Sequence, residues 1–125
     1  MESDAASELL SQLLPYEIVE AVMFGAYGWG DAPQFPGEEW EPYGDEEDPP
    51  CVPFDRRGVP LTWDEAEPFM RGWSFYGGFG SPNCYATYVY TNMRIFYVSQ
   101  YDGSTALRSL PRHPSSGTMP QMPGD

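Results

Sequence analysis

Residues 85–110 read YATYVYTNMRIFYVSQYDGSTALRSL, and aromatic and β-branched residues dominate this stretch. Such residues favour β-strands, and the stretch divides into three runs at Thr91-Asn92 and at Asp102-Gly103. Asp-Gly between two such runs is a strong signal for a two-residue hairpin. The pattern therefore predicts three consecutive antiparallel strands, over Tyr85 to Thr91, Met93 to Tyr101 and Thr105 to Leu110.

A further strand is expected just before this stretch, over Trp73 to Tyr76, followed by the glycine-rich segment Gly77 to Asn83. In the central run the alternation of side chains places Met93, Ile95, Tyr97, Ser99 and Tyr101 on one face and Arg94, Phe96, Val98 and Gln100 on the other. Neither set is cleanly polar. We therefore expect helices to cover one face, and the glycine-rich segments or a partner to meet the other.

Two helices are expected before residue 26. Ser3 or Asp4 can cap the first, which has Leu9, Leu10, Leu13 and Leu14 at helical spacing and stops or kinks at Pro15. The second is predicted over Tyr16 to Phe24, because Ile18, Val19, Val22 and Met23 form one apolar stripe with Glu17 and Glu20 opposite, and Gly25 ends it. These helices would pack their apolar stripes on the sheet, or alternatively against a partner or a second copy of this chain.

A third helix is indicated by Thr62 and Glu65, which have the spacing of a capping box. Pro68 should interrupt this helix, and Gly72 should end it. The expected fold class is therefore α+β, with two or three short helices packed on a three- to four-stranded antiparallel β-meander and a long acidic loop rich in proline and glycine.

The length of 125 residues predicts one domain. We divide it into a helical N-terminal part (1–25), an acidic loop (26–60), a short helix with the β-meander (61–111) and a mobile tail rich in proline, glycine and serine (112–125). A loop as long as the second part is usually functional or disordered.

The charge is strongly negative and unevenly placed. Nineteen carboxylates face six basic residues, all arginine, for a net charge of −13, and residues 1–67 hold 17 of the carboxylates but two of the arginines. This charge argues against direct binding to nucleic acid and against adsorption to anionic lipid surfaces. With no apolar run long enough to cross a bilayer and an acidic start, we expect a cytoplasmic protein that uses no membrane, in the host cytoplasm if it is encoded by a phage.

The motifs of common active sites do not occur. Cys84 has no base nearby in the sequence, and the single histidine, His113, stands in a proline-flanked tail. Gly77 to Gly80 lacks the lysine of a phosphate-binding loop, no Cys/His cluster of a zinc site exists, and the acidic run lacks EF-hand spacing. We therefore expect no catalytic residue, no metal and no cofactor.

The most distinctive segment is the acidic run from Glu38 to Asp48, in which seven of eleven residues are acidic and a tryptophan and a tyrosine stand among them. Carboxylate rows attract surfaces whose arginines and lysines bind phosphates, and aromatic residues carry much of the energy of interfaces. The predicted partner contact consists of Glu38, Glu39, Trp40, Glu41, Tyr43, Asp45, Glu46, Glu47 and Asp48.

In size, charge and lack of catalytic residues the chain resembles the small acidic proteins with which bacteriophages and other mobile elements block host enzymes, including nucleic-acid mimics and anti-CRISPR proteins. The resemblance implies stoichiometric binding to a basic surface of a nucleic-acid-binding protein. Two alternatives remain open. One is a module that sequesters a small, nucleotide-like ligand in a pocket of Trp73, Tyr76, Arg94 and Tyr97. The other is a structural subunit of a larger assembly such as a virion, which would self-associate.

Overall fold

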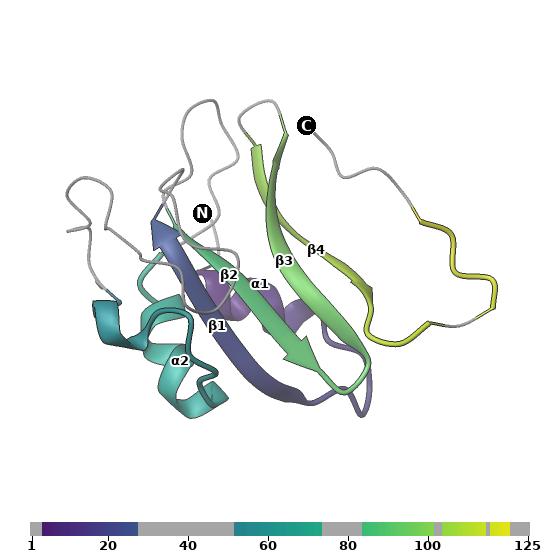
Figure 1. The fold of residues 1–125 in the computed structure, drawn as a ribbon, viewed down its shortest axis with the longest axis horizontal. Helices are drawn as coiled ribbons and strands as arrows, with labels where there is room; N and C mark the ends of the chain where they lie inside the picture. Colours follow the sequence, from purple (N-terminus) through teal and green to yellow (C-terminus); the bar gives the residue numbers. More distant parts are fainter. Residues whose placement is uncertain (1–3, 28–51, 74–83, 102–103, 115, 121–125) are drawn as a thin grey trace.

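The computed structural model describes residues 4–27, 52–73, 84–101, 104–114 and 116–120 (Figure 1). In chain order the elements are helix α1 (Ala5–Gln12), strand β1 (Val19–Tyr27), a 3₁₀ turn (Phe54–Arg56), helix α2 (Trp63–Met70) and strands β2 (Tyr85–Thr91), β3 (Arg94–Tyr101) and β4 (Ser104–Pro111). This is an α+β architecture: a four-stranded antiparallel sheet with two helices.

The four strands follow one another across the sheet in the order β1-β2-β3-β4. Strands β3 and β4 pair along their whole length, from Arg94 opposite Pro111 to Tyr101 opposite Ser104. That register is the one a two-residue Asp-Gly hairpin requires. The predicted antiparallel meander is therefore confirmed for its last three strands.

The second predicted helix is wrong, because residues 19–27 form the strand β1 at the edge of the sheet. A short apolar run fits both the helical and the strand period, and Ile18, Val19 and Val22 are β-branched residues that favour a strand. Pairing with β2, from Val19 opposite Thr91 to Tyr27 opposite Tyr85, decides between the two. These partners lie more than 50 residues away, so no local window contains them.

Strand β1 lies beside β2, the position in the sheet that was expected for residues 73–76. Trp73 belongs to no strand, and residues 74–76 lie outside the described part of the chain. Within the described residues the sheet thus has four strands, but its first strand comes from the N-terminal quarter of the chain.

Both helices start where the sequence predicts. The Asp4 side chain accepts a hydrogen bond from the Ser7 N–H and caps α1, which ends before Pro15. At α2, Thr62 and Glu65 form both hydrogen bonds of a capping box. Pro68 was expected to interrupt α2, but it lies inside the helix. A proline removes a single N–H donor, and the helix ends two residues later, at Met70, so it loses little by containing Pro68.

The core lies between the sheet and the helices, with α1 behind the strands and α2 beside β1 in Figure 1. Its centre is aromatic. The ring of Phe24 packs edge-on against those of Phe69 and Trp73, with 6.0 and 5.6 Å between the ring centres, and the ring centres of Trp73 and Tyr85 are 5.2 Å apart. Edge-to-face pairs of this kind add to the stabilisation that burial of the rings provides.

The predicted acidic loop, 26–60, is described only at its two ends. Residues 26–27 complete β1, and the chain from Val52 onward packs back on the core, with Val52 fully buried. A bridge between Val22 and Leu61 and a hydrogen bond from the Gly58 N–H to the Phe24 carbonyl hold this segment against β1. Among the described residues, no helix has both the length and the apolar character needed to cross a membrane.

Candidate interaction site

The predicted partner contact, from Glu38 to Asp48, lies outside the described residues. Its residues therefore stay a prediction from the sequence. The polar and apolar sites described below are formed by other parts of the chain.

Among the described residues of the alternative pocket, Arg94 and Tyr97 do not come together. Trp73 packs in the core on the helix-covered side of the sheet, and Tyr76 is outside the described residues. Arg94 lies on the same side as Phe96, with its guanidinium 4.5 Å from the centre of that ring, whereas Tyr97 is on the opposite face of β3. Arg94 and Tyr97 therefore cannot line one pocket of this sheet.

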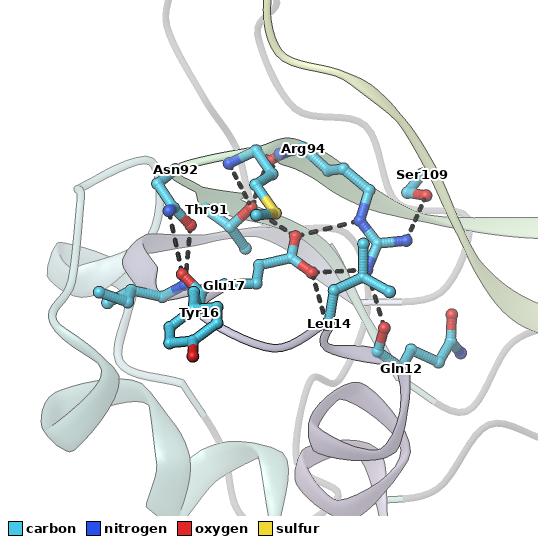
Figure 2. Close-up of polar contacts among 10 residues, drawn as sticks. Gln12, Leu14, Tyr16, Glu17, Thr91, Asn92, Arg94 and Ser109 are labelled. Atoms are coloured by element: carbon cyan, nitrogen blue, oxygen red, sulfur yellow. Dashed lines mark hydrogen bonds and ion pairs between the residues drawn. The ribbon is translucent and has the colours of Figure 1, made fainter.

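Arg94 instead lies at the centre of a polar site with Glu17, shown in Figure 2. Its Nε and Nη2 atoms donate to the two carboxylate oxygens of Glu17, at 3.0 and 2.6 Å, which is a bidentate ion pair. The Glu17 side chain is fully buried, and that of Arg94 is 23% exposed. Four further groups take part. Thr91 Oγ1 and the Leu14 N–H donate to Glu17, at 2.7 and 2.9 Å, and Arg94 donates to the Gln12 carbonyl at 2.8 Å and to Ser109 Oγ at 3.4 Å.

This arrangement holds the pKa of Glu17 at about 2, well below its ordinary value. The largest cause is the hydrogen bonding from Arg94, while burial acts in the opposite direction. A carboxylate with so low a pKa and with all its neighbours donating to it cannot accept a proton near neutral pH. Together with Arg94, this carboxylate joins the end of α1 to β2, β3 and β4.

Next to this ion pair, the turn between α1 and β1 exposes apolar side chains. Leu14, Tyr16 and Ile18 are 52, 90 and 64% exposed. Tyr16 has a φ of 67°, the left-handed region that non-glycine residues rarely occupy. Asn92, in the turn between β2 and β3, holds this backbone: its Oδ1 accepts from the Ile18 N–H at 2.8 Å, and its Nδ2 donates to the Tyr16 carbonyl at 3.2 Å (Figure 2).

This site is not among those predicted from the sequence, in which Glu17 is expected on the polar face of a helix and Thr91-Asn92 only as a turn between strands. The one local signal is Pro15, which biases Leu14 away from the helical conformation and so marks the end of the first helix before Glu17. The partners of Glu17 lie 74 and 77 residues away, and no spacing rule connects them.

Two residues considered for catalysis have different environments. Cys84 is buried, and burial raises its pKa to about 12, so the thiol stays protonated and is a poor nucleophile. His113 is exposed in the segment after β4. Within the described residues, no group of three or more histidine, cysteine or acidic side chains could hold a metal ion.

Searches of protein-family models, curated proteins and solved structures each gave no match to this chain.

Proposed function

We propose that this chain is a non-enzymatic interaction protein that inhibits a nucleic-acid-binding protein by binding its basic surface stoichiometrically, with residues 38–48 as the main contact. The observation that supports this proposal is the division of charge along the chain. The described residues hold eight of the carboxylates and all six arginines, a formal charge of −2. The other residues hold eleven carboxylates and no basic residue, a charge of −11.

The arginines of the fold are largely engaged within it. Four of them form ion pairs with described carboxylates: Arg56 with Glu65, Arg71 with Asp4 and Glu67, Arg94 with Glu17, and Arg112 with Glu20. A fifth, Arg57, is buried, donates to the Val52 carbonyl at 3.0 Å and lies over the ring of Tyr85. The chain thus carries a large excess of carboxylates, and a surface of arginine and lysine rows on another protein is complementary to it.

The aromatic residues within the acidic run suit an interface better than a solvating role. Charge attraction between exposed groups accelerates encounter but weakens as salt rises. Buried tryptophan and tyrosine side chains supply affinity that salt does not screen. Trp40 and Tyr43 stand among the seven carboxylates of residues 38–48, so one segment offers both contributions.

Capture of partners from a lysate of the source cells, at low and at high salt and with duplex DNA as competitor, tests the proposal. We expect a nucleic-acid-binding protein that salt releases and that duplex DNA displaces. The triple variant Glu46→Gln, Glu47→Gln, Asp48→Asn should weaken this capture at low salt.

The matched control neutralises three carboxylates of the described fold, Glu8→Gln, Asp55→Asn and Asp64→Asn, none of which forms a described ion pair. Both variants have a net charge of −10. Loss of capture in the first variant alone supports the acidic segment as the contact. Equal loss in both variants, or unchanged capture in the first, contradicts it.

A further inference from the structure

The face of the sheet opposite the helices carries a band of mostly large side chains. Two rows cross all four strands, as the register shows: Ala21, Tyr90, Ile95 and Leu110 form one row, and Met23, Tyr88, Tyr97 and Arg108 form the next. Tyr88 and Leu110 are 54 and 47% exposed, and Arg108 is exposed as well. We call these eight residues the open-face band.

The open-face band is poor in charge, although the chain is not. None of the eight described carboxylates belongs to it, and its single charged residue is the cation Arg108. The described carboxylates lie on and beside α1 and α2, in the 17–20 segment and at Asp55. Two copies of a chain with a charge of −13 repel each other over most approaches. The open face is the described surface on which they can meet with the least repulsion.

The open face is also complementary to itself. A row of small residues lies beside the second row of the band, two positions away along each strand. These residues are Gly25, Ala86, Ser99 and Ala106, next to Met23, Tyr88, Tyr97 and Arg108 respectively. The position of Gly25 is tight, because a Cβ there would lie 3.5 Å from the Ala86 Cβ. A two-fold axis that crosses the strands between the second row and these small residues places each side chain of the second row over a small residue of the second copy.

We propose that the open face is a self-association surface, on which a second copy of this chain packs its own open face in a two-fold dimer. In this arrangement Tyr88 and Tyr97 of each copy lie over Ala86 and Ser99 of the other, and Arg108 lies beside the aromatic rings of the second copy. A guanidinium over a tyrosine ring is attracted by the ring electrons, which gives the one cation of the band a favourable partner. A basic partner surface is a poorer occupant, because Arg108 would repel it.

This inference does not depend on the proposed inhibitory function, and salt separates the two. Raising the salt concentration screens the repulsion between two negatively charged copies, so it should strengthen the dimer. The same change should weaken binding of the acidic segment to a basic partner.

Sedimentation velocity of the intact protein over a range of concentrations, at low and at high salt, is the test. We expect the mass of a dimer at high concentration, and a lower dissociation constant at high salt. A monomer at every concentration and salt would overturn the proposal.

The matched pair of variants is Tyr88→Arg and Tyr16→Arg, which make the same change of charge at two exposed tyrosines, on the open face and on the α1–β1 turn respectively. Tyr88→Arg should raise the dissociation constant of the dimer about tenfold or more, which equals about 1.4 kcal/mol or more. Tyr16→Arg should leave it unchanged.

Ala106→Arg, which fills an exposed small position at the edge strand, repeats the test at a site where the fold is not at risk. Circular dichroism shows which variants remain folded. A dimer that survives both open-face variants, or that Tyr16→Arg disrupts equally, contradicts the proposed surface. The three-acid variant of residues 46–48 should dimerise at least as well as the original chain, whether or not it loses its partner.

Discussion

The two faces of the sheet are made by the same strands, but their side chains have different tasks. On the covered face, Val22, Phe24, Val89 and Phe96 are at most 1% exposed and pack under the helices. One position along each strand, the open face presents Met23, Tyr88 and Tyr97, which are aromatic or apolar as well but remain in contact with solvent. Composition alone does not separate these two sets. The difference shows that the position of the helices decides which apolar residues stabilise the fold and which remain available for binding.

Replacing two neighbouring aromatic residues of β3, one on each face, should show the largest difference between the faces. Phe96→Ala removes a fully buried ring and should lower the free energy of unfolding by about 3–5 kcal/mol. Tyr97→Ala removes a ring from the open face, and the loss of its contact with Tyr88 should cost about 1 kcal/mol or less. Urea unfolding of both variants, at the same low protein concentration, gives the two values.

The concentration matters in this comparison because dimerisation adds to the apparent stability of the original chain. At low concentration only the monomer contributes, and the ratio of the two effects reports on the faces themselves. Equal losses in the two variants would show that the open face is as well packed as the covered one, and would remove the basis for a free surface.

The second comparison is between two ion pairs, one under the helices and one at the surface. Glu17→Gln leaves Arg94 without its charged partner and should destabilise the fold by about 2–4 kcal/mol. Glu20→Gln removes the partner of Arg112, but the side chain of Glu20 is 47% exposed, so a loss below about 1 kcal/mol is expected. Thermal unfolding of the two variants at neutral pH measures both.

Acid should act on the same pair. Since the pKa of Glu17 in the folded protein is about 2 and its ordinary value is 4.5, ionised Glu17 stabilises the fold above about pH 4.5. This contribution should disappear progressively as the pH falls from 4.5 toward 2. The Glu17→Gln variant lacks this titration, so the stability difference between it and the original chain should shrink over that range. A difference that stays constant with pH would contradict the assignment.

The elements that the sequence predicts correctly depend on residues close together in the chain. The strands β3 and β4 follow from their composition and from the Asp-Gly step between them, and the α2 capping box follows from Thr62 and Glu65, three positions apart. The caps and turns of such elements are local hydrogen bonds, so a single sequence contains what is needed to find them.

The errors arise where distant contacts decide. Residues 19–24 satisfy a helical stripe, but their edge position beside β2 makes them a strand, and only the folded chain supplies that neighbour. The Glu17–Arg94 pair was missed for the same reason, since its members are 77 residues apart. Exposure of the open face was equally hidden, because the alternation in β3 shows two mixed faces and does not say which one the helices cover.

The smallest effect that we expect concerns the turn that joins the covering layer to the sheet. Tyr16→Gly should raise the free energy of unfolding by about 0.5–1 kcal/mol, because glycine occupies a φ of 67° without the steric penalty of a side chain. The opposite substitution, from glycine to a residue with a side chain, is Gly58→Ala, where φ is 70° and a Cβ would meet no atom within 4 Å. It should lower stability by a similar amount, because the strain there comes from the backbone and not from crowding. Differential scanning calorimetry should show the two melting temperatures moving in opposite directions. If Tyr16→Gly instead destabilises the protein, the tyrosine ring contributes to the fold despite its 90% exposure, and the turn belongs energetically to the covered side.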